Sequence, residues 1–499
     1  MTFTSKASAI APTHFGQFFI GGAWVAPSSN KTLKIVSPVT EEVVFEVAEA
    51  MPADVDKAVA AARAAFDTGP WPRLTPLERA AHLKEFARIL RTRAEDFAVA
   101  WTESAGVVQG MAKSSPEYSI GAFDRSIEQA SSFAWIEKHP TGNGVGLLVR
   151  EPVGVVAAIA PWNAPLATLL TKIAPALMAG CTVVMKPAPQ TPIEAYIVAE
   201  CAEAAKLPPG VINLLTAERD ASDHLVRHTG IDKISFTGSL ATGQHIAAVG
   251  GERIARVTLE LGGKSAAIVL DDYDLEKAAK SLVGGICVLS GQNCAGLTRV
   301  IVSRARHDEL VQHMVTAAQA VTIGDPYDPD IKLGPLTMKS QLEKVEGYIA
   351  TGIKDGATLA TGGKRPTHIK RGYYMEPTVF ANVDNAMTIA QEEIFGPVLC
   401  VIPCDGKDEV AREEDAIRIA NDSPFGLAGA VYTNDTNATY RIARQLRTGT
   451  VGQSAPSASF AIAFGGFKQS GLGREGGVEG LLAYLEPKTI LLPKEPDGI

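Results

Sequence analysis

Three polar side chains in separate segments of the sequence could together oxidise a carbonyl compound. Cys294 is a thiol flanked by glycines, Glu260 ends an apolar run, and Asn163 follows a proline–tryptophan pair. A thiol can add to an aldehyde, an amide can hold the resulting oxyanion, and a carboxylate can activate water to release the acid. The three residue types therefore indicate covalent oxidation of an aldehyde through a thioester.

This chemistry requires unusual titration of the thiol and the carboxyl group. An unperturbed cysteine has a pKa of about 8.5, so Cys294 needs a lowered pKa or a nearby base. Glu260 lies at the carboxyl end of an expected strand, and α/β proteins bind ligands at such strand ends. Apolar side chains around it there should raise its pKa. A raised pKa suits a general base. Asn163 lies in a loop stiffened by prolines, and a rigid amide donor suits an oxyanion site.

Each of these residues also has an ordinary structural explanation. Glu260 could pair with Lys264 in a surface loop, and Asn163 could form a turn beside proline. Most cysteines are buried structural thiols, and the others in this chain fit that description because they fall inside expected strands or helices. Cys294 differs because an expected helix ends just before it, which places the thiol at a turn. The other cysteines are Cys181, Cys201, Cys287, Cys400 and Cys404.

An alternation of short apolar runs and helical stretches surrounds Asn163 and Glu260. Strands that are apolar on both faces indicate a parallel sheet covered by helices on both sides. The sequence therefore predicts an α/β fold with a Rossmann-like, doubly wound sheet. The expected strands are 153–159, 182–185, 211–215, 233–236 and 257–259, and the expected helices are 166–178, 192–206, 220–228 and 242–249.

A second α/β region follows the first. Two capping signatures, from Thr75 to Glu78 and from Thr191 to Glu194, mark helix starts in the earlier part of the chain. The C-terminal strand, 488–492, has no obvious local partner, which suggests pairing with another subunit. In the second region the expected strands are 299–303, 398–402, 428–432 and 450–452, and the expected helices are 306–321, 408–420 and 436–446.

Residues at the ends of the first set of strands predict a cofactor site. Gly238 and Gly243 lie where a strand meets a helix, and Ser239 could donate its hydroxyl to a pyrophosphate at the helix N-terminus. Lys186 ends a neighbouring strand, where it could reach a ribose hydroxyl or simply point into water. The spacing of the two glycines differs from the common G-x-G-x-x-G fingerprint.

A later segment, Glu393-Ile394-Phe395-Gly396-Pro397, adds a carboxylate and an aromatic ring. A carboxylate can accept two hydrogen bonds from a ribose diol, and a phenyl ring can lie against a nicotinamide. The alternative is an acidic turn before a strand, with Phe395 in the core.

Length, composition and charge limit the class of protein. The chain has 499 residues, of which 46% are hydrophobic and 20% charged, as in soluble globular proteins of about two or three domains. A net charge of -8 argues against nucleic acid as a partner. No secretory signal and no uninterrupted apolar stretch long enough for a membrane span stands out. Six scattered cysteines suit a reducing compartment, so the cytoplasm is expected.

Taken in order and at their intervals, the motifs resemble those of the aldehyde dehydrogenase superfamily. The resemblance extends from Phe19 to Lys488. The matching segments include Pro161-Trp162-Asn163, Lys186-Pro187-Ala188, Phe236-Thr237-Gly238-Ser239, Glu260-Leu261-Gly262-Gly263, Gly291-Gln292-Asn293-Cys294, Glu393-Ile394-Phe395-Gly396-Pro397 and Phe464-Gly465-Gly466-Phe467-Lys468.

The resemblance implies a role for each matching residue. Cys294 would be the nucleophile, Glu260 the general base, and Asn163 with the Cys294 backbone NH the oxyanion site. Lys172 and Glu475 match polar positions near the active site. The cofactor positions are Pro161, Trp162, Lys186, Ala188, Phe236, Gly238, Ser239, Gly243, Leu261, Glu393 and Phe395.

The resemblance also implies three structural units and a homodimer or homotetramer. Residues 1–130 and 151–261 would form the NAD-binding domain, and residues 262–478 the catalytic domain. Residues 131–150 and 479–499 would form a small β oligomerisation segment.

Two departures from the family pattern bear on ligands. Pro189 stands where many NAD-preferring members have a glutamate, so NADP is an alternative to the expected NAD. Several positions that resemble the substrate tunnel are small, and smaller side chains enlarge a pocket. We therefore expect a bulky, apolar aldehyde. The expected pocket residues are Ala164, Thr171, Asn293, Ala295, Ala458 and Phe464.

Three other functions compete with aldehyde oxidation to the acid. A coenzyme A-acylating enzyme would not need Glu260 to activate water. A thiol esterase without redox activity would not need the phosphate and ribose positions. A structural protein that keeps only the oligomer would not need the full set of chemical residues.

Overall fold

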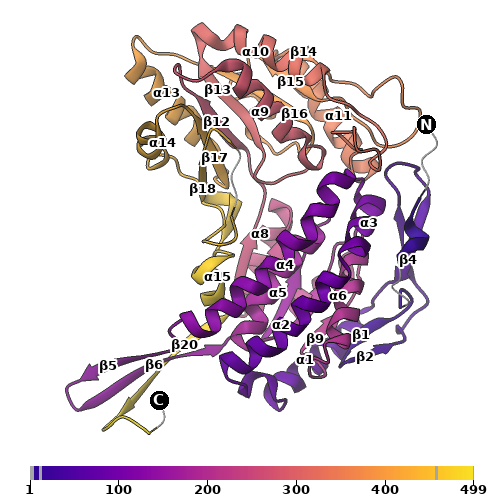
Figure 1. Ribbon diagram of the computed structural model, residues 1–499, viewed down its shortest axis with the longest axis vertical. Coiled ribbons are helices and arrows are strands. Elements are labelled where there is room, and N and C mark those ends of the chain that lie inside the picture. Colours follow the sequence, from indigo (N-terminus) through magenta and orange to yellow (C-terminus); the bar gives the residue numbers. More distant parts are fainter. Residues whose placement is uncertain (1–4, 11–13, 456–458, 498–499) are drawn as a thin grey trace.

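The computed structural model describes residues 5–10, 14–455 and 459–497, and two large sheets organise it (Figure 1). One sheet has eight strands in the order β19-β11-β10-β7-β8-β9-β1-β2, and the other has seven in the order β14-β15-β16-β13-β12-β17-β18. A three-stranded sheet, β20-β6-β5, and a two-stranded sheet, β3-β4, complete the set. The predicted mixed α/β fold with parallel sheets is confirmed.

The eight-stranded sheet is parallel across its centre, from β11 to β9, and antiparallel at its edges. Its strands are apolar on both faces. Val156 and Ala158 pack into one core, whereas Val155, Ala157 and Ile159 pack into the other. The strands are β1 Phe18–Ile20, β2 Ala23–Val25, β7 Val155–Ile159, β8 Thr182–Lys186, β9 Ile212–Leu214, β10 Lys233–Thr237, β11 Arg256–Glu260 and β19 Gly471–Leu472.

Helices cover both faces of this sheet. On one side α2, α4, α5 and α6 lie side by side (Figure 1), and on the other α1, α7 and α8 pack together. Their bounds are α1 Pro52–Asp67, α2 Pro76–Thr92, α3 Ala94–Ala105, α4 Gln109–Ser132, α5 Pro165–Ala179, α6 Ile193–Ala204, α7 Arg219–Arg227 and α8 Leu240–Glu252.

One of the two predicted capping signatures is confirmed and the other is wrong. Thr75 accepts the backbone NH of Glu78 through its hydroxyl at 3.3 Å and donates its own NH to the Glu78 carboxylate at 2.7 Å. At α6 the cap is Pro192, without a side-chain hydrogen bond. Thr191 instead donates its hydroxyl to the Trp162 carbonyl at 3.1 Å, which ties α6 to the loop that carries Asn163.

The seven-stranded sheet has two cores, one on each face, and its interior strand β12 was not predicted. The strands are β12 Ser265–Val269, β13 Leu297–Ser303, β14 Thr358–Thr361, β15 Thr378–Ala381, β16 Val398–Cys404, β17 Ala428–Tyr432 and β18 Thr450–Gln453. The helices of this part are α9 Leu275–Cys287, α10 Arg304–Gln319, α11 Lys339–Lys354, α12 Thr388–Gln391, α13 Glu409–Asn421, α14 Thr436–Ala443 and α15 Gly477–Leu482.

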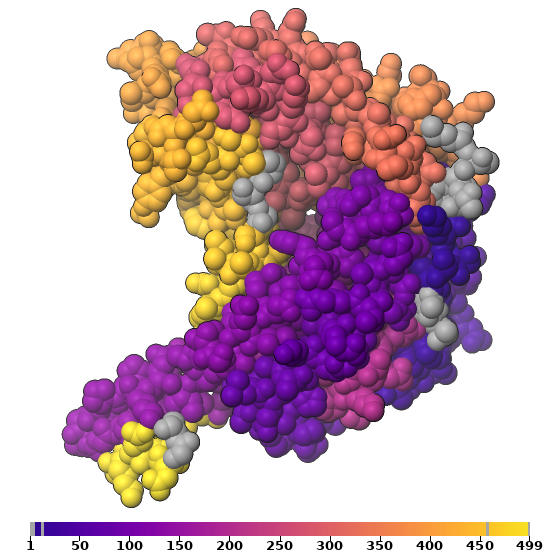
Figure 2. Space-filling model, viewed as in Figure 1, coloured from indigo at the N-terminus to yellow at the C-terminus, as the bar shows by residue number. Residues whose placement is uncertain are grey.

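A three-stranded arm projects from the body of the molecule (Figures 1 and 2). It consists of β5 Ile136–Thr141, β6 Gly144–Pro152 and β20 Leu485–Leu492. β20 pairs with β6 along its whole length, from Leu485 opposite Pro152 to Leu492 opposite Val145. The expectation that the C-terminal strand lacks a local partner is therefore wrong, because β5 and β6 form an antiparallel hairpin that supplies one. A further short sheet near the N-terminus contains β3 Thr32–Val36 and β4 Val43–Ala48.

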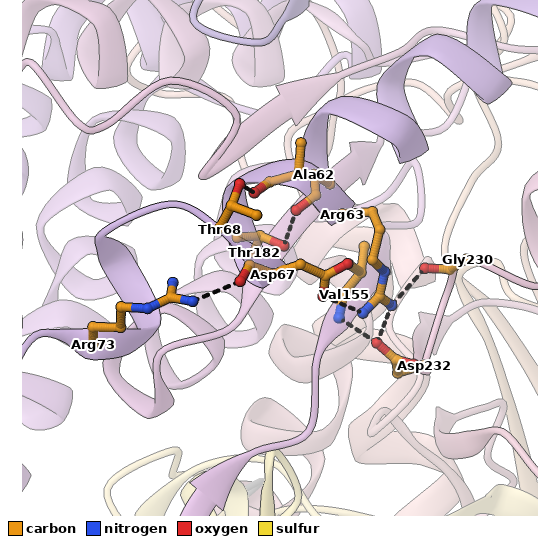
Figure 3. Close-up of polar contacts among 10 residues, drawn as sticks. Ala62, Arg63, Asp67, Thr68, Arg73, Val155, Thr182, Gly230 and Asp232 are labelled. Atoms are coloured by element: carbon orange, nitrogen blue, oxygen red, sulfur yellow. Dashed lines mark hydrogen bonds and ion pairs between the residues drawn. The ribbon is translucent and has the colours of Figure 1, made fainter.

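A polar cluster fixes α1 to the amino ends of the first sheet's strands (Figure 3). The Arg63 guanidinium donates to the Gly230 carbonyl at 2.9 Å and forms an ion pair with Asp232. Asp232 also accepts the Val155 backbone NH at 2.7 Å, and the Thr182 hydroxyl donates to the Ala62 carbonyl at 2.9 Å. These contacts hold α1 in place beside the amino ends of β7, β8 and β10. Among the described residues, no helix is long and apolar enough to cross a membrane.

Candidate active site

A strained turn presents Cys294. After α9 the backbone of Leu289, Ser290 and Gly291 has positive φ values of 51°, 54° and 76°. Left-handed conformations cost about 1–3 kcal/mol at residues other than glycine and persist only where neighbouring groups hold them. Ser290 donates its hydroxyl to the Gly334 carbonyl at 2.8 Å. The Gln292 side chain accepts the backbone NH of Thr337 at 2.9 Å. These contacts fix the turn just before the thiol.

The surroundings of Cys294 disfavour its thiolate. Burial, together with the nearby carboxylates of Glu393 and Glu260, raises the pKa of this thiol to about 12. The protein alone therefore supplies no lowered pKa, and the thiol depends on a nearby proton acceptor or on positive charge brought by a ligand. Cys294 still differs from the remaining cysteines, because part of its surface is exposed. The other cysteines are all buried: Cys181, Cys201, Cys287, Cys400 and Cys404.

Asn163 lies beside the cysteine loop. Its side-chain amide donates to the backbone carbonyl of Gln292 at 2.8 Å, two residues before Cys294. The backbone carbonyl of Asn163 accepts the indole NH of Trp101 at 3.0 Å. A hydrogen-bonded amide at this place can serve as an oxyanion donor. The role of Trp101 was not predicted, because an isolated tryptophan far upstream gives no signal in the sequence.

Glu260 ends β11 inside the protein, with 3% of its surface exposed. Neither carboxylate oxygen has a hydrogen-bond partner among the described residues. Burial raises its pKa well above the ordinary value, the charge of Glu475 raises it further, and Lys172 acts in the opposite direction. The predicted rise is confirmed. The alternative of a surface ion pair with Lys264 is wrong, because that lysine is also buried and without a hydrogen-bond partner in the described chain.

Two further polar residues near Glu260 form a buried ion pair. The Lys172 ammonium on α5 lies 2.5 Å from the Glu475 carboxylate and donates to the Thr237 hydroxyl at 2.6 Å. Glu475 is held by backbone hydrogen bonds in both directions with Phe464. The pair therefore connects the end of β10 to the segment after β19, and its charges act on the Glu260 carboxyl group.

The turn after Glu260 touches both Glu393 and Cys294. Gly263 donates its backbone NH to the Glu393 carboxylate at 3.0 Å. A Cβ at Gly262 would lie 2.4 Å from that carboxylate, and a Cβ at Gly263 would lie 2.4 Å from the Cys294 carbonyl. Side chains at these glycines would push the groups apart. The sequence Glu260-Leu261-Gly262-Gly263 thus brings three predicted site segments together.

Phe395 lies against Trp162 and not in the core. The two rings meet edge to face, with centroids 5.3 Å apart. Phe395 has a φ of 60°, and the Gln341 side chain donates to its carbonyl at 2.7 Å, which stabilises this conformation. The alternative of a core position for Phe395 is wrong, since the residue is only half-buried. Gln341 lies on α11, and no motif in the sequence pointed to it.

A cleft of about 870 Å³ opens at the carboxyl edge of the first sheet. Lys186, Pro189, Phe236 and Thr242 line it. Burial lowers the pKa of Lys186 to about 8, against the influence of Glu218, so the alternative of a lysine pointing into water is wrong.

The N-terminus of α8 lies at this cleft. Ser239 caps α8 by accepting the Thr242 NH at 3.4 Å. Gly243 packs so closely on Leu261 that a Cβ would lie 2.4 Å from its side chain. A helix N-terminus, a lysine and a deep cleft at the ends of parallel strands fit a dinucleotide.

The predicted substrate-pocket residues lie in different places. Ala164 packs against the buried cluster that contains Trp101 and Val107, whereas Thr171 lines a small separate cavity with Phe460. Of the other predicted residues, Phe464 lies near Phe460, and Asn293 and Ala295 lie in the cysteine loop. Phe464 packs on Phe460 with ring centroids 4.7 Å apart, Asn293 accepts the Ala295 NH at 3.1 Å, and Ala458 lies outside the described residues.

A doubly wound sheet with a cleft at its carboxyl edge, in a chain that also brings together a thiol, an amide and a buried carboxyl group, is typical of a dinucleotide-dependent oxidoreductase. No cluster of metal-ligating side chains lies within the described ranges. The chain belongs to the aldehyde dehydrogenase family, which residues 24–490 match. The protein is therefore an enzyme that oxidises aldehydes, and the predicted family is confirmed.

Relatives and solved structures agree with this assignment. The chain is 42% identical to geranial dehydrogenase from Castellaniella defragrans, over 95% of this chain and 98% of that protein. It resembles the crystal structure of an aldehyde dehydrogenase from Mycobacterium tuberculosis complexed with NAD⁺, with 43% identity, a TM-score of 0.92 and coverage of 97% and 99%. A mutant of aldehyde dehydrogenase C from Pseudomonas syringae, complexed with NAD⁺ and octanal, is 38% identical with a TM-score of 0.92 and coverage of 96% and 97%.

Proposed function

We propose that this enzyme oxidises a bulky, apolar aldehyde to the carboxylic acid, with NAD as the electron acceptor and Cys294 as the nucleophile. The observation that carries the proposal is the meeting of three segments. The turn after Glu260 packs on the carbonyl of Cys294, and the amide of Asn163 bonds to the same cysteine loop.

The catalytic cycle assigns one task to each polar group. The Cys294 thiol gives up its proton to water and its sulfur forms a bond to the carbonyl carbon, while the Asn163 amide and the Cys294 backbone NH donate to the oxygen that becomes negative. When the carbonyl re-forms, this carbon loses its hydrogen as a hydride, for which NAD would supply the two-electron acceptor when it is bound. The thioester that remains on Cys294 is then hydrolysed by a water molecule, whose proton goes to Glu260. The Lys172–Glu475 pair adjusts the proton affinity of Glu260.

The cofactor would lie along the carboxyl edge of the first sheet. Ser239 and the N-terminus of α8 would hold the pyrophosphate, Lys186 the adenine-side ribose, and Glu393 the other ribose. Trp162 and Phe395 would bound the nicotinamide end. The other residues proposed to contact the cofactor are Pro161, Ala188, Phe236, Gly238, Gly243 and Leu261.

The charges around the cleft are mixed. The carboxylates of Glu218, Asp220 and Asp223 line it, and so do the cations Lys186 and Arg219. A 2′-phosphate would meet both repulsion and attraction there, so these charges do not by themselves select NAD over NADP. The NAD⁺ in the related M. tuberculosis enzyme supports NAD as the cofactor. Pro189 leaves the ribose without its usual carboxylate partner, so discrimination against NADP should be weaker than in enzymes that have one.

Two relatives support an apolar substrate. One acts on geranial by name, and the other was crystallised with octanal. The small side chains at Ala164 and Thr171 favour a wider pocket than larger residues at these positions would. Ala164, Thr171, Asn293, Ala295, Ala458 and Phe464 remain the proposed pocket residues.

The three-stranded arm supports a homo-oligomer. Leu491 on β20 is 71% exposed, and Ile136 on β5 is 40% exposed. Apolar side chains on open strands invite pairing with a second copy. The proposed units are the NAD-binding domain of residues 1–130 and 151–261, the catalytic domain of residues 262–478, and the oligomerisation segment of residues 131–150 and 479–499. Six free cysteines fit the cytoplasm.

The deciding experiment is a panel of aldehydes assayed with NAD and with NADP by NADH absorbance. Wild-type enzyme should oxidise apolar aldehydes such as octanal with a higher kcat/KM than acetaldehyde. Cys294→Ala should abolish oxidation but keep NAD binding, measured by calorimetry. Acetaldehyde as the best substrate would refute the apolar class. Oxidation that depends on coenzyme A, or ester hydrolysis without any NADH, would replace the proposed reaction.

A further inference from the structure

Two hydrogen bonds from distant segments hold the main chain on either side of Asn163. The indole NH of Trp101, on α3, donates to the Asn163 carbonyl at 3.0 Å. The hydroxyl of Thr191, just before α6, donates to the Trp162 carbonyl at 3.1 Å. Both donors are buried, with 4% of Trp101 and 1% of Thr191 exposed, so water has little access to either donor.

The two carbonyls belong to the two peptide units that meet at the Asn163 α-carbon. A peptide unit is planar, so a hydrogen bond to its carbonyl restricts the orientation of the whole unit. Only φ and ψ of Asn163 connect the two units. Restricting both units therefore restricts the direction in which the Asn163 side chain leaves the backbone.

A third hydrogen bond holds the tip of the Asn163 side chain. Its amide donates to the backbone carbonyl of Gln292 at 2.8 Å. Gln292 is fixed in turn, because its side chain accepts the backbone NH of Thr337 at 2.9 Å. A primary amide carries two N–H donors, so one remains for the oxygen of a substrate.

We propose that Trp101 and Thr191 are positioning residues for the oxyanion. They hold the backbone of Asn163 so that the remaining amide N–H meets the carbonyl oxygen of the aldehyde. The inference rests on the proposed function, in which this amide stabilises the oxyanion. Trp101 and Thr191 act through the main chain, without contact with the aldehyde.

The position of an oxyanion donor matters as much as its presence. Loss of one such donor costs about 10²–10³-fold in kcat, and a displacement of about 1 Å can cost about 10²-fold. Trp101→Phe removes the indole NH and keeps an aromatic ring. We expect the first NADH per active subunit to form about tenfold more slowly in this variant, with an unchanged Kd for NAD.

The deciding test is a double-mutant cycle with Asn163→Ala. This substitution removes the amide but leaves the backbone carbonyl to which Trp101 donates. Trp101→Phe should slow NADH formation about tenfold in the wild-type background and less than about twofold in the Asn163→Ala background. The measurement is stopped-flow absorbance with octanal at saturating NAD. Equal slowing in both backgrounds would mean a merely structural tryptophan and would overturn the inference.

Thr191 provides a second test with rescue by a conservative variant. Thr191→Val keeps the shape of the side chain but loses the hydroxyl, and it should slow NADH formation about as much as Trp101→Phe. Thr191→Ser keeps the hydroxyl and should restore most of the rate. A serine variant as slow as the valine variant would contradict a role for this hydrogen bond.

Matched controls separate the hydrogen bonds from packing. Trp71 is also fully buried, but its indole NH has no hydrogen-bond partner in the described part of the chain. Trp71→Phe removes the same atoms as Trp101→Phe and should keep the wild-type rate. Thr182→Val is the control for Thr191→Val, because the Thr182 hydroxyl donates to the Ala62 carbonyl at 2.9 Å, at the amino edge of the sheet. Equal slowing in these controls would assign the effect to packing and overturn the inference.

Failure of the proposed function gives different results. If Asn163→Ala keeps the wild-type rate, the amide does not stabilise the oxyanion, and the positioning role of Trp101 and Thr191 is refuted with it. If wild-type enzyme oxidises no aldehyde, the proposed reaction itself is wrong.

Discussion

Glu475 and Lys172 are 303 positions apart in the chain, yet they form a fully buried ion pair with 2.5 Å between the carboxylate oxygen and the ammonium nitrogen. Each partner acts on the Glu260 carboxyl group, in opposite directions. The pair therefore adjusts the pKa of Glu260, the proposed general base, without a hydrogen bond to it.

Glu475→Gln should shift the acid limb of the kcat profile to lower pH. The substitution removes a charge that raises the pKa of Glu260 and leaves Lys172, which lowers it. A larger fraction of Glu260 is then ionised at a given acid pH. Loss of one partner of a buried pair also destabilises a protein by about 3–5 kcal/mol. The check is kcat against pH, together with urea unfolding. If the Glu475→Gln variant folds and its acid limb stays at the wild-type pH, the proposed effect of Glu475 on the pKa of Glu260 is contradicted.

Glu260→Gln should stop the reaction after one turnover. Glutamine cannot take a proton from water, so hydrolysis of the thioester should slow by about 10²–10⁴-fold, the usual contribution of a general base. Stopped-flow absorbance should then show a burst of about one NADH per active subunit followed by a slow phase. Wild-type-like turnover, or loss of the burst itself, would assign Glu260 a different task.

The same variant should gain stability relative to wild type as pH rises. The folded pKa of Glu260 lies above its ordinary value of 4.5, so ionisation of the carboxyl group opposes folding. The contribution of the protonated Glu260 carboxyl group to wild-type stability is fully present below the unfolded pKa of this group. That contribution is lost as pH rises toward the folded pKa. Glu260→Gln lacks this loss. Unfolding free energies at pH 5 and pH 9 provide the measurement, and a difference that is equal at both would contradict the burial argument.

The parallel sheets could be predicted from the sequence because buried strands are marked by continuous Val and Ile runs. β7, β8 and β10 all fall within one or two residues of their expected ranges. The interior strand β12 was not predicted, because Ser265–Val269 begins directly after the Glu260–Lys264 motif without any turn residue that separates the two.

The reactive groups could also be predicted, but not the contacts that hold them. Motifs mark Cys294 and Asn163. No periodicity marks Trp101 or Gln341, whose hydrogen bonds to Asn163 and Phe395 come from distant helices. The pKa of the thiol depends on burial and on two carboxylates brought together by folding, which residue order alone does not give.

Leu491→Asp should weaken the oligomer. Leu491 is an exposed apolar residue of β20 on the projecting arm (Figure 2), and a carboxylate there would resist burial against a second copy. Light scattering coupled to size-exclusion chromatography should show a smaller mass at low micromolar concentration. Val410→Asp is the control, because Val410 is 68% exposed on α13, away from the arm. An unchanged mass for Leu491→Asp would remove the arm from the proposed interface.

Pro189→Glu should sharpen the preference for NAD. Pro189 lines the cofactor cleft together with Lys186, on the side proposed for the adenine ribose. A carboxylate there can accept hydrogen bonds from a ribose diol and repels a 2′-phosphate. The kcat/KM with NADP should fall about tenfold, and that with NAD should stay or rise. Pro189→Gln is the matched control, because an amide of the same length lacks the charge and should leave the NADP value nearly unchanged. Equal losses with both cofactors in Pro189→Glu would mean that the ribose does not lie at this position.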